Sequence, residues 1–222
     1  MIAEQTLQYF KRASRRFSAD QGGLALVEFA YAAPILILLT FGGAELANVA
    51  ITHTRISGIT STVADGIARV RDRIDEVDVN DVITGAKLSG SSLNLTTRGR
   101  IVISTVEDNA ATTSNTTDQI ITWQRCKGLK NVATSDTIGA QGAVLTTGIG
   151  PTGRQISATP GNPVIIVEIF HDYQPIMTDM IETPATIKYR SAFSVRDRTL
   201  QTLQNAQNLT GASVANCSLY NS

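Results

Sequence analysis

The hydrophobic pattern of the chain is dominated by one apolar run. Residues 24–44 read LALVEFAYAAPILILLTFGGA, and their only ionisable side chains are Glu28 and Tyr31. As a helix this run is about 30 Å long, which matches the hydrocarbon thickness of a bilayer. A helix in a soluble core rarely stays apolar on every face for about six turns. The pattern therefore predicts one transmembrane helix over residues 24–44, surrounded by the lipid bilayer.

Beyond Ala44 the pattern changes to one apolar position every three or four residues, with charged residues between them. The positions of this stripe are Val49, Thr52, Ile56, Ile59, Val63, Ile67, Val70 and Ile74. Such spacing is typical of an amphipathic helix, so we expect the helix to continue to Ile74, with Gly58 and Gly66 as positions where it can bend. The stripe fits a stalk above a membrane anchor, and it also fits a helix packed on its own domain. The two interpretations are compatible.

A second, shorter helix is expected after this stripe. Asp78 is typical of the start of a helix and Gly90 of the position just after its end, so the helix is predicted over residues 78–88. Together the two segments form a predicted amphipathic helical stalk over residues 45–90.

Four later runs are rich in β-branched and aromatic residues and are bounded by turn residues, as β-strands are. They are residues 100–107, 119–126, 164–173 and 187–196. The last run alternates apolar and polar positions with the period of two of a half-buried strand. Residues 91–222 are therefore predicted to form a β-rich domain. The expected fold class is α+β, with a long N-terminal helix, transmembrane in its lower half, packed on a mainly antiparallel β-sheet.

The stretch between the second and third of these strands, residues 128–163, is rich in Gly, Thr and Ser. We expect a long surface loop with short strand pieces, which would be a variable contact region. Gly148, Gly150 and Gly153 have the spacing G-x-G-x-x-G, but Pro151 interrupts it and no helical pattern follows. These glycines therefore indicate a loop and not a dinucleotide site.

The charge balance gives no basis for binding nucleic acid, because 19 basic and 19 acidic residues leave a formal net charge of zero. Basic side chains nevertheless gather within residues 1–23, where Glu4 and Asp20 are the acidic residues. These basic residues are Lys11, Arg12, Arg15 and Arg16. Basic residues beside a membrane helix mark its cytoplasmic side. We therefore expect a cytoplasmic N-terminus and residues 45–222 on the opposite side of the membrane.

The border between the basic segment and the apolar run has an unusual composition. Gly23 and Leu24 are followed within the run by Glu28 and Phe29. A charge at the centre of a membrane helix costs about 2.5–3.5 kcal/mol, and less near the interface. Glu28 is then either a tolerated interfacial residue or a partner for the amine that cleavage after Gly23 would create at Leu24. An ordinary secretory signal fits badly, because the strongest apolar run follows the Ala-x-Ala site at residues 30–32.

At these residues the sequence resembles the TadE-like proteins, which are minor pilins or pseudopilins of tight-adherence (Flp-type) pilus systems in bacteria. Their type IV prepilin-like signal has Gly before the cut, Glu at the fifth mature position and an aromatic residue next. Gly23, Leu24, Glu28 and Phe29 match this signal, although the aromatic is often Tyr in this class. Pro34 falls where TadE-like proteins usually have a proline. The resemblance covers residues 11–60 and is looser beyond them.

The resemblance implies a role and a set of partners. A prepilin peptidase would cleave after Gly23 and make Leu24 the new N-terminus, so that residues 1–23 are a removable leader. Glu28 and Phe29 would serve processing or assembly. The further implied partners are other pilins and minor pilins, and the pilus assembly platform in the membrane. The protein would reside in the bacterial inner membrane as a single-pass subunit with a periplasmic C-terminal domain, or be incorporated in the pilus.

Small residues in the span favour association with other helices. Pro34 removes one backbone hydrogen bond, which membrane helices tolerate when neighbours cover the freed carbonyl. Gly43 and Ala47 form a small-xxx-small pair that would allow close helix contact.

The two cysteines, Cys126 and Cys217, would lie on the side of the membrane where thiols are oxidised. A disulfide between them is expected to pin the C-terminal tail to a strand. A catalytic cysteine working with His53 or His171 has no supporting motif, and neither histidine has metal-ligand spacing. We therefore expect no enzyme, no cofactor and no metal site.

The resemblance thus implies a non-enzymatic subunit of a tight-adherence pilus. It implies a minor pilin or pseudopilin because the family's major pilins are far smaller than this chain. The alternative is an uncleaved, single-pass adhesion or binding module, which would share the helix and strands without needing Gly23 or Glu28. An exported hydrolase would need a nucleophile, a base and an orienting group, and the sequence offers no such set.

Overall fold

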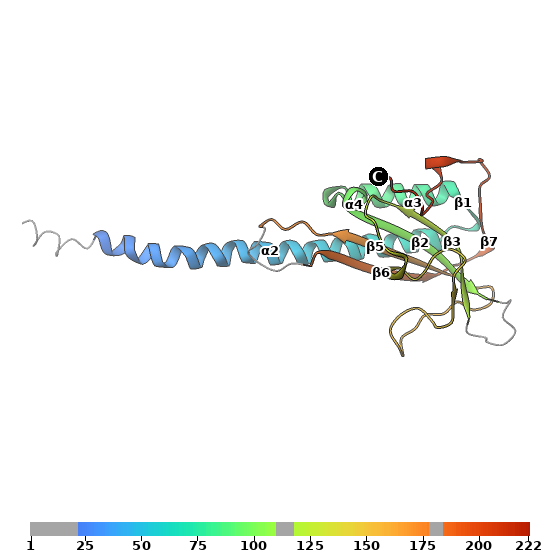
Figure 1. Cartoon of the computed structure of the whole chain (residues 1–222), viewed down its shortest axis with the longest axis horizontal. Coiled ribbons are helices and arrows are strands. Elements are labelled where there is room, and N and C mark those ends of the chain that lie inside the picture. The colour runs from blue at the N-terminus through green and yellow to red at the C-terminus, as the bar shows by residue number, and fades with distance from the viewer. Residues whose placement is uncertain (1–21, 110–117, 178–183) are drawn as a thin grey trace, which may run out of the picture. The chain divides into compact units, whose positions relative to one another are not determined.

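The structure is a computed structural model that describes residues 22–109, 118–177 and 184–222. The chain divides into two compact units. One combines residues 1–48 with 176–181, and the other combines residues 49–175 with 182–222. The elements confirm the α+β class: a long N-terminal helix is followed by a mostly antiparallel β-sheet (Figure 1). The basic residues of the predicted leader lie outside the described residues.

Helix α2, Gly22–Ala68, contains the whole apolar run and most of the amphipathic stripe. In the second unit the stripe is buried, as the spacing predicts, and its largest side chains belong to the main core. These side chains are Ile56, Ile59, Val63 and Ile67. Ile101 and Ile103 on one strand and Ile165 on another meet them from the sheet. This part of α2 is therefore an amphipathic helix packed on its own domain.

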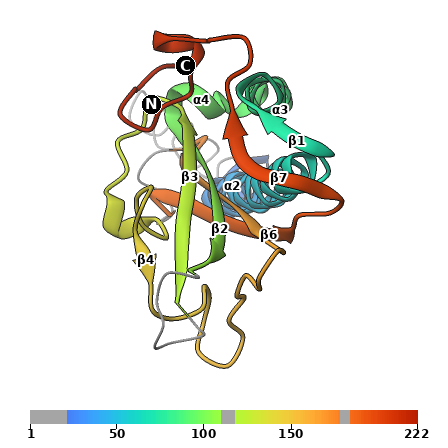
Figure 2. The same cartoon turned by 90° about the vertical axis from the view of Figure 1, so that its right-hand side faces the viewer.

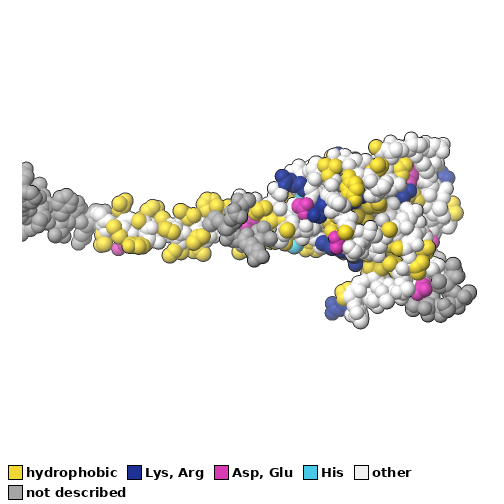
Figure 3. All heavy atoms as spheres, in the orientation of Figure 1, with side chains coloured by type: hydrophobic (Ala, Val, Ile, Leu, Met, Phe, Trp, Pro, Cys, Tyr) yellow, Lys and Arg dark blue, Asp and Glu magenta, His cyan; other side chains and the backbone are white. Residues whose placement is uncertain are grey.

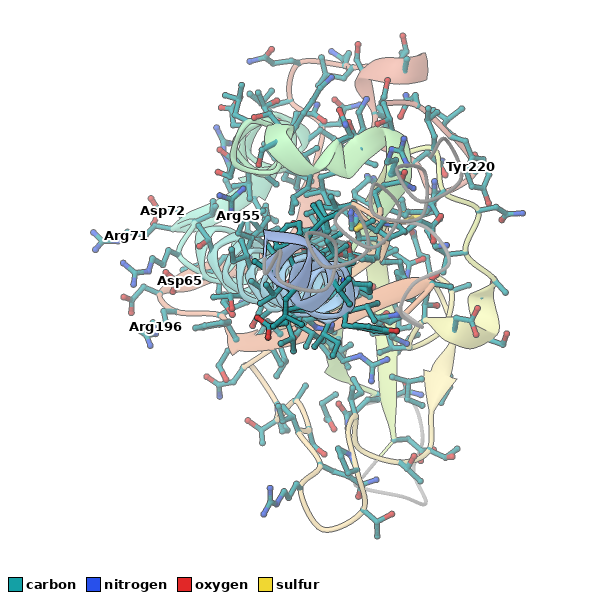
Figure 4. All side chains as sticks on the ribbon, turned by 90° about the vertical axis from the view of Figure 1, so that its left-hand side faces the viewer. Arg55, Asp65, Arg71, Asp72, Arg196 and Tyr220 are labelled. Carbon is teal, nitrogen blue, oxygen red and sulfur yellow. A yellow bond between two sulfur atoms is a disulfide. The ribbon has the colours of Figure 1, made fainter. Side chains whose placement is uncertain are left out.

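The helix does not reach Ile74, so the expectation of a continuous helix to that residue is wrong. The chain turns after Ala68, and Asp72 adopts a left-handed backbone with φ of 58°. Ile74 is still fully buried, but it enters the core from strand β1, Asp72–Asp75. Arg71 and Asp72 point outward beyond this turn (Figure 4).

Arg198 supplies hydrogen-bond donors to the backbone carbonyls at the C-terminal end of the helix. Its guanidinium donates to the carbonyls of Ile67 and Val70, and the amide of Arg196 donates to the carbonyl of Ala68. The last carbonyls of a helix have no partner within it, and a cation near them is favoured by the helix dipole. The helix thus ends where a distant segment supplies donors for its last turn.

The main sheet has five strands in the order β4-β3-β2-β5-β6, with every neighbouring pair antiparallel (Figure 2). Its strands are β2 Gly99–Asp108, β3 Gln119–Lys127, β4 Val144–Leu145, β5 Val164–Asp172 and β6 Thr186–Ser194. The four strands expected from sequence are all present. A second sheet pairs β1 in parallel with β7, Arg198–Gln204, and neither of these strands was predicted.

Both faces of the main sheet are covered, which explains why β2 and β5 are buried along nearly their whole length. On the face away from α2, Val106, Ile121 and Ile166 form a second core with Ile149 and Ala158. The last two residues belong to the stretch 128–163. This stretch was expected to be a surface loop with short strand pieces. It does contain β4, but it also closes a core, because apolar side chains within it cover the sheet.

Helix α3, Glu76–Ser89, begins two residues earlier than predicted and is capped at Gly90. Asp75 and Asp78 form a capping box that satisfies the first backbone amides. The carboxylate of Glu76 is buried, and it accepts hydrogen bonds from both Nε and Nη2 of Arg125 on β3. This ion pair fixes the start of α3 against the sheet. The remaining short helices are η1 Ser91–Leu93, α4 Leu95–Arg98, η2 Thr134–Asp136 and η3 Gly211–Ser213.

Candidate functional site

The N-terminal part of α2 exposes apolar side chains on every face. Leu24 is 59% exposed, Phe29 66% and Leu39 68%. Figure 3 shows hydrophobic side chains at many places along the length of this segment. Within the described residues this is the one helix long and apolar enough to cross a membrane, and none of its most apolar window is buried. A helix in a soluble core would bury these side chains, so the arrangement supports a single-pass membrane anchor.

The four residues of the predicted processing site lie in the first two turns of α2. Gly23, Leu24, Glu28 and Phe29 are all exposed. Leu24 and Glu28 are four residues apart, so they share a helix face about 6 Å apart along the axis. A side chain added at Gly23 would meet no atom within 4 Å. The fold itself therefore does not require glycine at this position.

The residues expected to serve helix packing are exposed as well. The helix runs without interruption through Pro34. Gly43 and Ala47 are one turn apart on the same face, and a Cβ added at Gly43 would have open space around it. This face is free to receive another helix, and its role in packing stays a prediction.

Glu45 was not predicted as a site residue, but its side chain is buried and only 1% exposed. Its Oε2 accepts hydrogen bonds from the backbone amides of Ile176 at 2.8 Å and Met177 at 3.1 Å. All three residues belong to the same unit. The available signal was that Glu45 is the first acidic residue after the apolar run. Nothing local to Glu45 shows that the chain returns to it 131 residues later.

Cys126 and Cys217 form the disulfide expected from the sequence, with Cα atoms 4.6 Å apart and a sequence separation of 91. Cys126 lies on β3 and is buried beside Val102 and Phe170. The amide of Cys126 also donates to the carbonyl of Ala215 at 2.7 Å. The C-terminal tail is thus attached to β3 both covalently and through its backbone.

Arg100 on β2 gives the tail a third attachment. Its guanidinium donates to the carbonyls of Gly128, Cys217 and Leu219, and it lies 4.2 Å from the centre of the Tyr220 ring. Burial lowers the pKa of the Arg100 guanidinium, which the nearby Tyr220 partly opposes. Three carbonyl acceptors compensate for the loss of water around this cation. The tail is therefore attached to the second unit by the disulfide, by a backbone hydrogen bond and by the Arg100 side chain.

The two histidines take part in packing. The ring of His53 is 3.1 Å, Nδ1 to Oη, from Tyr189. His171 is a buried residue of β5. Across residues 22–109, 118–177 and 184–222, no three His, Cys, Asp or Glu side chains gather as a metal site would require. Gly150 and Gly153 lie in a loop closed by an antiparallel bridge between Ile149 and Ile156, and Gly148 directly precedes this bridge.

His171 makes the stability of the second unit sensitive to acid. Burial lowers its pKa below 6.5, and the charges of Arg98 and Lys130 lower it further, against an opposing effect of Asp172. The unfolded chain therefore binds a proton more readily than the folded chain. The stability contributed by neutral His171 is complete above pH 6.5 and is lost as the pH falls toward the folded pKa.

We expect guanidinium unfolding, followed through the buried Trp123, to show lower stability at about pH 5 than at about pH 7.5. The variant His171→Asn should lose less stability over the same interval, because its amide does not titrate. Equal losses in the two proteins would contradict this assignment.

Comparison with known proteins gives one match. A protein-family model described as TadE-like protein matches residues 23–65. No curated protein and no solved structure matches the chain. The matched segment begins at Gly23 and includes the whole exposed apolar part of α2. The TadE-like family is not a family of enzymes. Over residues 23–65, the chain is therefore similar to the TadE-like proteins, a family associated with tight-adherence pili.

Proposed function

We propose that the chain is a minor pilin or pseudopilin that takes part in assembling a bacterial tight-adherence pilus, after a prepilin peptidase cleaves it behind Gly23. The observation that carries this proposal is the exposed apolar helix with Gly23, Leu24 and Glu28 at its N-terminal border. A helix made only to anchor a domain needs apolar length. It needs neither a glycine before the apolar run nor a carboxylate one turn inside it.

The bond between Gly23 and Leu24 is well placed for cleavage. It lies in the first turn of α2, where backbone amides have no partner within the helix. Gly22 and Gly23 are also weak helix formers, since glycine loses more conformational freedom on folding than other residues. The first turn therefore opens at low cost into the extended backbone that a peptidase binds.

Glu28 has a defined partner once the bond is cut. Cleavage would create a positive amine at Leu24, which lies on the same helix face as Glu28. In the low dielectric of the membrane, a carboxylate one turn inside the lipid is strongly stabilised by such a cation. The amine can come from the same subunit or from an adjacent one, and the second arrangement would join subunits during assembly.

The proposed topology follows from the distribution of charge. The basic residues before Gly23 favour a cytoplasmic leader, and the second unit would then lie in the periplasm. A disulfide is stable in that compartment and not in the cytoplasm, so the bond between Cys126 and Cys217 agrees with this orientation. Other pilins would contact the exposed apolar face, including Gly43 and Ala47, and the assembly platform would act on the membrane-embedded subunit.

The mass of the mature protein tests the proposal. The chain is coexpressed with a prepilin peptidase, purified from membranes and analysed by mass spectrometry of its N-terminal peptide. We expect an N-terminus at Leu24. The matched control is Gly23→Val, which the open space around Gly23 allows the helix to accept but which places a branched side chain at the cut. An intact leader in the unmodified chain would contradict the proposal and favour the uncleaved adhesion module.

A further inference from the structure

Glu45 is a buried carboxylate at a position where burial needs an explanation. Burying a charge is costly unless hydrogen bonds replace its water. The amides of Ile176 and Met177 supply two such bonds to one oxygen. Residues 45, 176 and 177 belong to one compact unit that also contains the apolar helix. The contact is therefore a tether between the helix and a short turn that is distant in sequence.

The tether lies at a defined height along the helix. Leu24 and Glu45 are 21 residues apart, or about 32 Å at the rise of an α-helix. The hydrocarbon core of a bilayer is about 30 Å thick. If the apolar run spans the membrane as proposed above, Glu45 lies at the boundary where the helix leaves the lipid. Whatever Glu45 holds lies at the same boundary.

Glu45 fixes the backbone of Ile176, whose apolar side chain is exposed. Ile176 is 62% exposed although its backbone is fixed. Leu46, which follows Glu45 on the helix, is also 62% exposed. Single exposed apolar residues are ordinary on a protein surface. Here the exposed side chain is fixed to the helix, through Glu45, at the end of the proposed membrane span.

We infer that Glu45 clamps the turn of Ile176 and Met177 so that Ile176 inserts into the lipid interface as a second membrane contact. This inference rests on the membrane-spanning helix of the proposed function. The partner is the boundary between headgroups and acyl chains, into which an interfacial apolar side chain reaches by about 5–10 Å. The carboxylate itself stays out of the hydrocarbon because the two amides shield it.

Site-directed fluorescence tests the contact in the full-length protein. A single cysteine is introduced by Ile176→Cys and labelled with a fluorescent maleimide, which is specific because both native cysteines are joined in the disulfide. The protein is placed in nanodiscs of phosphatidylcholine and phosphatidylglycerol, with or without bromine on the acyl chains. Leu36→Cys in the middle of the span is the positive control. Leu200→Cys on β7, which is 54% exposed, is the matched aqueous control.

We expect brominated lipid to quench the probe at position 176, less strongly than at position 36 and clearly more than at position 200. Quenching at 36 with none at 176 would overturn the inference and leave the membrane span intact. Absence of quenching at 36 would overturn the span itself, and the inference with it. An Ile176→Cys protein that escapes the lipid quencher and forms a disulfide-linked dimer would assign this surface to a second copy of the chain instead.

A second variant tests the clamp. Glu45→Gln replaces one carboxylate oxygen by an NH2 group, which only donates, and it removes the negative charge that both backbone amides face. We expect the probe at 176 to lose its quenching in this background while the probe at 36 keeps it. Emission from the buried Trp123 verifies that the second unit is folded. Unchanged quenching at 176 in the Glu45→Gln protein would overturn the role of Glu45.

Discussion

Replacing Glu28 with glutamine is expected to reduce the yield of pilus-incorporated protein by more than about tenfold, since losing only about 1.4 kcal/mol of pairing energy corresponds to that factor. The substitution keeps the size of the side chain and its exposed position on α2, and it removes the charge. The amide cannot balance the positive amine that the proposed cleavage would create at Leu24, so that amine would remain unpaired in the membrane. The measurement is a quantitative immunoblot of sheared fibres and of the membrane fraction.

Two variants at this border serve as controls. Phe29→Tyr introduces the aromatic residue that is common in the family, and it should leave the fibre yield near that of the unmodified protein. Glu28→Asp keeps the charge on a shorter side chain and should retain part of the yield. If Glu28→Gln gives the same maturation and fibre yield as the unmodified protein, the proposed pairing of Glu28 with the Leu24 amine is wrong.

Loss of the disulfide is expected to lower the free energy of unfolding of the second unit by about 4 kcal/mol. The bond closes a segment with a sequence separation of 91, and in the chain-entropy description its loss frees that segment in the unfolded state. The variant carries Cys126→Ala together with Cys217→Ala. Guanidinium unfolding followed by emission of Trp123, the single tryptophan of the chain, measures the change.

Reduced protein with both cysteines present is the matched control. Cys126 is buried beside Val102 and Phe170, so its replacement by alanine also removes packing contacts. Reduction breaks the bond and keeps those contacts, which separates the two effects. Arg100 should still hold the C-terminal tail through its backbone acceptors. An unfolding midpoint that is the same before and after reduction would contradict the predicted stabilisation.

The sequence predicted the parts of the fold whose signals are local. An apolar run of membrane length and a stripe with helical spacing both describe how neighbouring residues behave along one helix. The same holds for the alternation within residues 187–196, which is β6 in the structure. These patterns require knowledge only of which side chains share a face. Such patterns can therefore be recognised in the sequence even when the segment that covers that face is unknown.

The sequence did not predict where α2 ends. Residues 69–74 include neither a proline nor a glycine, and Ile74 continues the apolar stripe. The helix ends because Arg198 and the strand β7 bring donors to its last turn and pair with β1. The sequence of β7, RTLQTLQ, is weakly apolar and forms a strand in contact with β1. Each of the two segments thus depends on the other, across more than half of the chain.

The sequence by itself determined the membrane-length helix, its amphipathic continuation, the four main strands and the candidate border at Gly23 and Glu28. Only the tertiary structure decided that residues 128–163 close a second core and that Glu45 is buried. The physical reason is that periodicity depends on neighbours a few residues away. The partner of a buried charge, such as the amide of Ile176 for Glu45, comes from wherever the folded chain returns.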